Sequence, residues 1–136
     1  MRLSDQLARG DLLAAACPSR DVLKHLTSRW GVLVLIVLEQ RMHRFSELRR
    51  AVGGVSERML SQTLQHLEQD GMVARVAYQV VPPHVEYSLT PLGREAAEKV
   101  RVLADWIEMS LPRIMKHWDK AKGARVGGEA QAAQTV

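Results

Sequence analysis

The sequence predicts a mainly α-helical domain with one small β-hairpin, and three observations lead to this fold class. Apolar residues recur at steps of three and four along most of the chain, which is the spacing of amphipathic helices. Residues 73–89 instead form two runs rich in β-branched residues around a Pro-Pro pair, as expected for a hairpin. A length of 136 residues suits one compact domain. We therefore expect a domain over residues 17–120, between an N-terminal arm at 1–16 and a tail at 121–136.

Two helices are expected at the start of this domain. Cys17-Pro18-Ser19 opens the first one, because proline is tolerated in the first positions of a helix. Residues 30–40 predict a second helix, which is apolar on nearly all sides and is therefore expected at the centre of the core. Residues 41–44 then form a connector or a small strand.

Two further helices are separated by a glycine turn. Ser46 is a suitable N-cap for a helix over residues 47–52, which Gly53-Gly54 terminates. Ser56 is a suitable N-cap for the next helix, over residues 57–70, and the glycine that follows it closes that helix.

The helix over residues 57–70 has two unlike faces. Leu60, Leu64 and Leu67 fall within one narrow arc at the helical period. The opposite face carries Arg58, Ser61, Gln62, Gln65 and Gln69. Arginine and glutamine side chains can pair bidentately with the edges of guanine and adenine, so this face favours contact with DNA bases.

A hairpin and a long helix complete the domain. Residues 73–81 and 85–89 predict two strands that are joined by a stiff tip, Pro82-Pro83-His84. Thr90 is expected to cap the long helix, with Pro91 at its first position.

The long helix carries an apolar stripe that runs to residue 118. Its members include Leu92, Val100, Leu103, Trp106, Ile107, Leu111, Ile114 and Trp118. Pro112 lies inside this pattern and is expected to kink or break the helix near Met109-Ser110. Residues 121–136 are small and polar without periodicity, which predicts a disordered tail.

This order of elements is that of a winged helix-turn-helix, with residues 47–70 as the helix-turn-helix and the hairpin as the wing. A domain of this type lays the N-terminal part of its second helix in the major groove of DNA. The charge has a matching distribution. Residues 41–58 hold five arginines against two glutamates, a net +3 of the chain's +4. The planar fork of arginine suits phosphate groups and guanine edges.

Composition excludes several other classes of protein. No apolar run reaches the roughly 18 residues of a membrane span. The N-terminus carries no hydrophobic leader, and the single cysteine, Cys17, rules out an intrachain disulfide, so a cytoplasmic protein is expected. Aromatic residues make up only 4%, too few for base-stacking platforms. The five histidines show no metal-binding spacing, and neither a phosphate-binding glycine loop nor a nucleophile motif occurs. We therefore expect no metal, no cofactor and no enzymatic activity.

Residues 17–119 resemble the HxlR-type transcriptional regulators, a branch of the MarR-like winged-helix proteins. The matching pieces, in chain order, are Cys17-Pro18, Arg29-Trp30, residues 44–50, residues 56–71 and residues 82–94. The resemblance implies homodimers that bind palindromic operators and associate through their terminal helices, where the apolar stripe of the long helix lies. The chain departs from the family at the wing tip, where His84 stands in place of the usual basic residue.

The candidate DNA contacts form three groups. Base readout is expected from Arg58, Ser61, Gln62 and Gln65. Phosphate contact is expected from Arg44, Ser46, Arg49 and Ser56, which lie at helix starts or on the supporting helix. In the wing, Arg75 and His84 are the remaining candidates.

Cys17 is the candidate redox sensor. It lies at the first turn of a predicted helix, three residues before Arg20, and both the helix N-terminus and this cation favour the reactive thiolate. Some HxlR-type proteins use a cysteine that matches this position to sense oxidants or electrophiles. The alternative is an inert thiol that is kept for packing.

The sequence thus predicts a transcriptional regulator that acts as a homodimer on a palindromic DNA operator and is switched at Cys17 by oxidation or by an electrophile. One alternative is a regulator that responds to a small molecule, with an inert Cys17. A second is a winged-helix module that binds proteins and does not bind DNA.

Overall fold

The computed structural model describes residues 9–134, and the side chains of residues 9–123. The chain forms two compact units, Met1–Arg101 and Val102–Val136. The first unit therefore ends inside the range 17–120, which the sequence predicts as one domain. Residues 1–8 of the expected arm and residues 135–136 of the expected tail lie outside the described residues.

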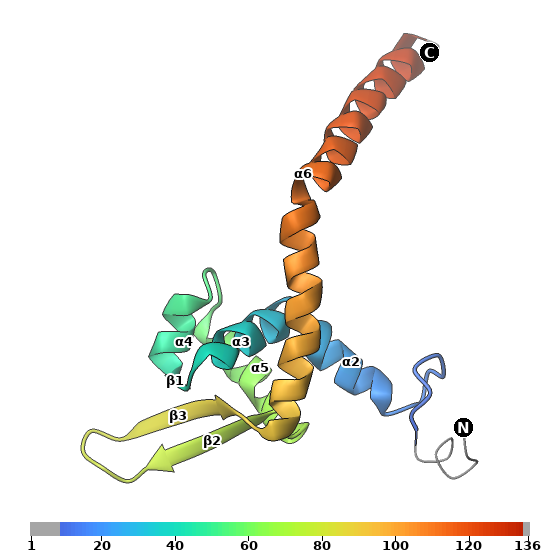
Figure 1. Cartoon of the computed structure of the whole chain (residues 1–136). Coiled ribbons are helices and arrows are strands. Elements are labelled where there is room, and N and C mark those ends of the chain that lie inside the picture. Colours follow the sequence, from blue (N-terminus) through green and yellow to red (C-terminus); the bar gives the residue numbers. More distant parts are fainter. Residues whose placement is uncertain (1–8, 135–136) are drawn as a thin grey trace. The chain divides into compact units, whose positions relative to one another are not determined.

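The described elements confirm a mainly α-helical fold with a small hairpin. In chain order they are α2 (Ser19–Thr27), α3 (Arg29–Gln40), β1 (His43–Arg44), α4 (Phe45–Ala51), α5 (Glu57–Gln69), β2 (Val73–Tyr78), β3 (His84–Leu89) and α6 (Pro91–Gln134) (Figure 1). The strands form an antiparallel sheet in the order β1-β3-β2. The short connector after α3 thus contains the strand β1, which pairs with β3, the central strand of the sheet.

Two of the predicted helix caps are present. The Ser56 hydroxyl oxygen accepts a hydrogen bond from the Met59 backbone nitrogen at 3.1 Å, and that of Thr90 accepts one from the Gly93 nitrogen at 2.9 Å. Gly71 follows α5 with a φ of +77°, a conformation that glycine adopts without steric cost.

The prediction that Ser46 caps α4 is wrong. The helix begins at Phe45 with Arg44 at the N-cap, so Ser46 lies in its first turn. The Glu47 carboxylate accepts a hydrogen bond from the Arg44 backbone nitrogen at 2.9 Å and thereby satisfies a free N–H group at the helix start. This hydrogen bond, together with one from Arg41, holds the pKa of Glu47 below its usual value.

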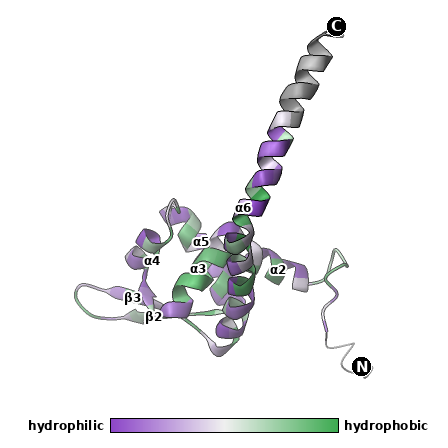
Figure 2. Cartoon of the chain, turned by 45° about the horizontal axis from the view of Figure 1, so that its top comes forward, coloured by the Kyte–Doolittle hydropathy of each residue, from purple (hydrophilic) through white to green (hydrophobic). Residues whose placement is uncertain are grey.

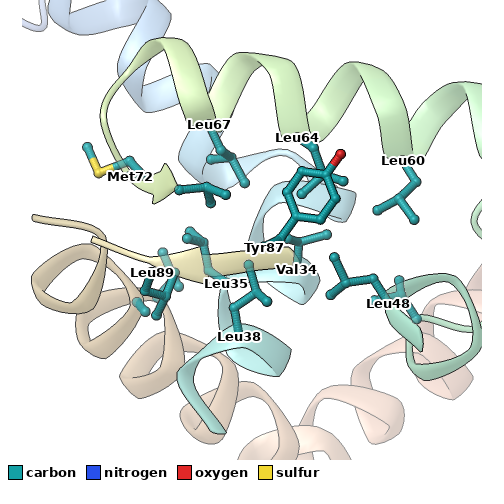
Figure 3. Packing of buried hydrophobic residues seen from close by; sticks show 14 of the residues in the cluster. Val34, Leu35, Leu38, Leu48, Leu60, Leu64, Leu67, Met72, Tyr87 and Leu89 are labelled. Atoms are coloured by element: carbon teal, nitrogen blue, oxygen red, sulfur yellow. The ribbon is translucent and has the colours of Figure 1, made fainter. Parts of the chain in front are cut away.

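The core lies between α3, α5 and the sheet (Figure 3). Helix α3 contributes Val34, Leu35 and Leu38, all at most 1% exposed, and Figure 2 shows that this helix is hydrophobic over nearly its whole length. Further buried members are Leu48 from α4, Leu60, Leu64 and Leu67 from α5, and Tyr87 and Leu89 from β3. The predicted leucine arc of α5 is therefore the face that packs on the core.

The hairpin is shorter than predicted. Its register runs from Val73 opposite Leu89 to Tyr78 opposite His84, so β2 ends three residues before the expected Val81. His84 belongs to β3 and not to the tip, because its ring stacks on that of Tyr78 with centroids 4.7 Å apart.

Helix α6 agrees with the prediction at Pro112 and differs from it in the tail. Pro112 lies inside the helix, which continues past it and changes direction in its orange part (Figure 1), as expected for a kink. The helix also continues through residues 121–134, where the sequence predicts disorder, because alanine, lysine, glutamate and glutamine there favour helix despite the glycines between them. None of the described helices has the length and apolar character that crossing a membrane requires.

The start of α6 packs closely on the turn between α5 and β2. The Thr90 backbone nitrogen donates a hydrogen bond to the Met72 carbonyl oxygen at 3.1 Å. A Cβ atom built on Gly93 would overlap the same carbonyl group. Glycine is therefore required at this position for the helix to approach the turn.

Replacing Gly93 with alanine is expected to lower the free energy of unfolding by about 1–3 kcal/mol, because the added methyl group forces α6 away from Met72. Urea denaturation followed by circular dichroism measures this change. Gly53→Ala is the matched control: no atom lies within 4 Å of a Cβ built there, and the expected change is below about 0.5 kcal/mol. Equal losses in the two variants would contradict the close approach.

Candidate nucleic-acid interface

The exposed face of α5 presents the four residues that the sequence assigns to base readout. We call these residues the recognition surface: Arg58, Ser61, Gln62 and Gln65, all exposed. On the opposite side of the helix, Leu60, Leu64 and Leu67 are at most 2% exposed and fix the rotation of α5 against the core. The surface holds one cation, one hydroxyl and two amides, and none of its own members is acidic.

The residues expected to contact phosphate lie around the turn between α4 and α5. Arg44, Ser46, Arg49 and Ser56 are all exposed. The Ser56 oxygen accepts the capping hydrogen bond from Met59, so its hydroxyl proton stays free to donate. Gly54, with a φ of +85°, gives the turn its direction.

Two of the five arginines in this region are held by glutamates. Arg49 binds Glu57 at 3.0 Å, and Arg41 binds Glu47 at 3.1 Å. The first pair is exposed on both sides, and such pairs contribute little to stability, so Arg49 can exchange Glu57 for a phosphate at low cost. No described carboxylate forms an ion pair with the other three: Arg44, Arg50 and Arg58.

Arg50 is a candidate that sequence reasoning missed. It lines a concavity of about 370 Å³ together with Phe45, Ser46, Arg49 and Glu57. Its position could have identified it, because Arg50 directly follows the predicted contact Arg49 and lies with it in the last turn of α4.

A second concavity, of about 410 Å³, lies between α5 and the hairpin. It brings Ser61 and Gln65 together with Arg75 of β2, all three of them predicted DNA contacts. Glu68 and Tyr87 also line it, so the surface beside the arginine is mixed in charge. The tertiary structure therefore joins the wing to the recognition surface at the base of the hairpin.

The prediction of His84 as a wing-tip contact does not match its surroundings. Its Nε2 atom lies 3.4 Å from a carboxylate oxygen of Glu86, and only 23% of its side chain is exposed. The Tyr78 hydroxyl also faces Glu86, whose hydrogen bond and negative charge raise the pKa of that tyrosine. The tip itself, residues 79–83, has no basic residue, and Val81 is fully exposed.

Cys17 lies in a loop that shapes its chemistry. Its Sγ atom is 2.9 Å from the Ser19 hydroxyl oxygen and accepts a hydrogen bond from the Asp11 backbone nitrogen at 3.1 Å. Hydrogen bonds from Ser19, and then from Asp11, hold the pKa of the thiol below its usual value. The thiol is partly exposed, in contrast to a packing cysteine.

Arg20 does not serve as the nearby cation that the sequence suggests. Its guanidinium donates to the carbonyl oxygens of Leu12 and Leu13 at 2.9 and 3.2 Å. The arginine therefore acts on the loop, and it is the hydrogen bonds around the sulfur that favour the thiolate.

The apolar stripe of α6 divides between two environments. Val100 is 7% exposed and belongs to the core of the first unit, so its assignment to a dimer interface is wrong. Within the described part of the second unit, Leu103, Trp106, Ile107, Leu111 and Trp118 are each between 38% and 58% exposed, and Ile114 is partly buried. Leu92, at the start of the helix, is 50% exposed.

A helix-turn-helix that is followed by a β-hairpin next to its second helix defines the class of winged helix-turn-helix proteins. The chain belongs to the HxlR-like helix-turn-helix family, whose model matches residues 25–115. The resemblance seen in the sequence is thereby confirmed.

Similar proteins agree with this assignment. The uncharacterised HTH-type transcriptional regulator YtfH of Escherichia coli strain K12 is 66% identical over 113 residues, which cover 83% of this chain and 90% of YtfH. The solved structure of the transcriptional regulator ytfH from Salmonella typhimurium is 62% identical, with a TM-score of 0.79, and covers 82% of this chain and 99% of its own. The redox regulator HypR in its oxidised form is 36% identical, with a TM-score of 0.63 and coverages of 68% and 96%. The protein is therefore a transcriptional regulator of the HxlR type and not an enzyme.

Proposed function

We propose that the protein binds double-stranded DNA sequence-specifically, as a homodimer on a palindromic operator, with α5 in the major groove. The recognition surface carries this proposal, because its arginine and two glutamines are the side chains that pair bidentately with guanine and adenine. In a two-fold dimer, two such helices read half-sites one helical turn apart.

Phosphate contacts would position this helix. Arg44, Ser46, Arg49 and Ser56 surround the turn before α5, and Arg50 adds a further cation. Arg75 supports a contact from the base of the wing, since it lines the same concavity as Ser61 and Gln65. His84, which is half-buried beside Glu86, supports the shape of the hairpin instead.

Gln62→Ala is expected to weaken operator binding by about 1–3 kcal/mol and to relax the preference at one base position. Arg49→Ala is expected to weaken binding to all DNA sequences alike. It is also expected to make the slope of log affinity against log salt concentration shallower by about one. The bound sequence is first selected from genomic fragments, and affinities are then titrated at several salt concentrations. Gln40→Ala, at the exposed end of α3, is the control.

Unchanged operator affinity for both variants would remove this assignment of contacts. Binding without sequence preference would count against a sequence-specific regulator, and a lack of DNA binding would favour the alternative of a winged-helix module that binds proteins.

The dimer interface that we propose is the exposed apolar stripe of α6 in the second unit. Its two tryptophans, Trp106 and Trp118, are 55% and 58% exposed. Large aromatic side chains in this state are typical of interface anchors. A second copy of the chain would cover them, as the family resemblance implies.

Trp106→Glu is expected to weaken self-association by at least about tenfold, because a buried charge without a partner opposes the dimer. Sedimentation velocity at several concentrations measures this effect. Lys116→Glu, two residues from Ile114 and outside the apolar stripe, is the control and is expected to sediment as the wild type. Identical sedimentation of the two variants would place the dimer interface elsewhere.

Cys17 is proposed as the switch. Its thiol is partly exposed and its pKa is lowered, the two properties of reactive cysteines. Similarity to a solved redox regulator also supports this role. Since the chain has one cysteine, disulfide formation has to join Cys17 to a thiol of another molecule; the two thiols lose two electrons and two protons to the oxidant, and one S–S bond forms.

Diamide is expected to change operator affinity in the wild type but not in Cys17→Ser. Ser19→Ala removes the hydroxyl hydrogen bond, which is the largest of the contributions that lower the pKa of the thiol, and leaves the backbone hydrogen bonds in place. The pKa therefore rises, less thiolate is present at neutral pH, and the response slows. Gel shifts after timed diamide treatment measure both effects, with Thr27→Ala, at the exposed end of α2, as the control for loss of a hydroxyl. Equal responses of wild type and Cys17→Ser would leave Cys17 as an inert thiol.

A further inference from the structure

Helix α5 has two flanks, one on each side of the recognition surface. On the flank towards the hairpin, Ser61 and Gln65 share a concavity with Arg75 of β2. On the other flank, Met59 and Gln62 share a concavity with side chains of α2 and of the start of α3. At the helical period, Met59 and Ser61 point about 160° apart around the helix axis. The two concavities therefore lie on opposite sides of α5.

A helix that lies in the major groove of DNA has a phosphate backbone on each side. The groove is roughly 12 Å wide, and an α-helix with its side chains is roughly 10–12 Å across. The two flanks of the helix therefore face different DNA strands. Contacts with phosphates set the position of the helix, so cations on both flanks would fix it across the groove.

The flank towards the hairpin offers little positive charge. Arg75 is its cation, and Glu68 lines the same concavity. In β3, Nε2 of His84 lies 3.4 Å from a carboxylate oxygen of Glu86. The tip of the hairpin, residues 79–83, has no basic residue. The hairpin is therefore poorly equipped to hold a phosphate backbone by itself.

The flank towards α2 carries a lysine that is fixed in place relative to α5. Lys24 is exposed and lines one concavity with Gln62 of the recognition surface. The next residue, His25, ties α2 to α5 through two contacts. Its Nδ1 atom lies 2.6 Å from a carboxylate oxygen of Asp70, and its ring stacks on that of His66 with centroids 4.3 Å apart. Lys24 therefore keeps its position beside the recognition surface.

An arginine lies on the same flank. Arg29, the first residue of α3, is exposed, and the carbon of its guanidinium lies 5.3 Å from the centroid of the Trp30 ring. This ring lines the concavity with Met59 and lies 3.9 Å from a Cβ atom built on Gly54, in the turn before α5. The cation–π contact therefore holds the arginine near the start of α5.

Both cations are available to an external anion. No described carboxylate forms an ion pair with Lys24 or Arg29. Asp70, at the end of α5, is engaged by His25. Asp21, in the first turn of α2, likewise forms no ion pair within the described residues. The positive charge of this flank is therefore not neutralised by the protein.

We propose that Lys24 and Arg29 bind DNA phosphates on the side of the major groove that faces α2, opposite the strand that Arg75 contacts from the hairpin. They supply the positive charge that the tip of the hairpin lacks. This inference rests on the proposed DNA binding and adds two contacts from outside the helix-turn-helix and the wing.

Lys24→Met and Arg29→Met test the contacts in the full chain, by titrating the selected operator and an unrelated duplex at several salt concentrations. Each variant is expected to weaken binding to both duplexes at least about threefold. The slope of log affinity against log salt concentration is expected to become shallower by about one for each lost contact. The ratio of the two affinities is expected to stay that of the wild type, because the recognition surface is unchanged.

Lys99→Met is the matched control. This exposed lysine lies on α6, which carries none of the predicted DNA contacts, and its loss changes the net charge by the same amount. The control is expected to bind as the wild type. Slopes for Lys24→Met and Arg29→Met that equal the slope for Lys99→Met would overturn the proposal.

A neutral methylphosphonate, placed at each operator phosphate in turn, locates the contacts. Substitution at a contacted phosphate weakens binding by the wild type, and the variant that lacks the contacting cation is expected to lose this effect. The phosphates found with Lys24→Met and with Arg75→Met are expected on opposite strands, across the groove that holds α5. Phosphates on the same strand would contradict the arrangement on two flanks.

The same titrations separate this inference from the proposed function. If the wild type binds neither duplex, the proposed function fails and this inference fails with it. If the wild type prefers the operator while Lys24→Met and Arg29→Met keep its salt slope, only this inference is wrong.

Discussion

The packing of one leucine face of α5 against α3 is the contact on which the rest of the site depends. Leu60, Leu64 and Leu67 are almost fully buried against a helix that is itself apolar on most sides. Burying each such side chain stabilises the fold by roughly 1.5–3 kcal/mol. Because a helix is rigid, holding one face on the core leaves the opposite face with its arginine, serine and glutamines in solvent. Rotation of α5 by one residue would expose leucines and bury the amides, at a cost of several of these contributions.

The arginines around the helix-turn-helix form few and weak ion pairs. Glu47 serves the start of α4, and Glu57 meets Arg49 across the turn on a solvent-exposed surface. Exposed pairs of this kind are weak and exchange partners easily. The region is therefore net positive, and its exposed Arg49 can exchange Glu57 for another anion at low cost. The wing adds only Arg75 to this positive surface, and its tip is apolar.

Two features of the first unit bear on the proposed regulation and the proposed DNA binding. The loop at Cys17 lowers the pKa of a partly exposed thiol through hydrogen bonds and not through a neighbouring cation, so its reactivity depends on the folded shape of residues 11–19. The flank of α5 towards α2 carries Lys24 and Arg29 next to one residue of the recognition surface. Both features lie next to α2, which contacts α3 and α5.

The sequence by itself determined the elements whose signals are local. The caps at Ser56 and Thr90, the hairpin and the two faces of α5 follow from residues within a few positions of one another. Helix α4 begins earlier than predicted because the Glu47 carboxylate, and not the Ser46 hydroxyl, accepts the hydrogen bond at the helix start. Both groups lie within a few residues of that start, so this signal is also local.

Only the tertiary structure decided which distant groups meet. The approach of Arg75 to Ser61 and Gln65, and the stacking of His25 on His66, join residues that are separated by ten or more positions, and periodicity does not encode such pairings. The apolar residues of α6 keep the same spacing along the stripe, yet Val100 is buried and Trp106 is exposed. Helical spacing gives the direction of a side chain, whereas burial depends on what packs against it, and packing exists only once the chain has folded.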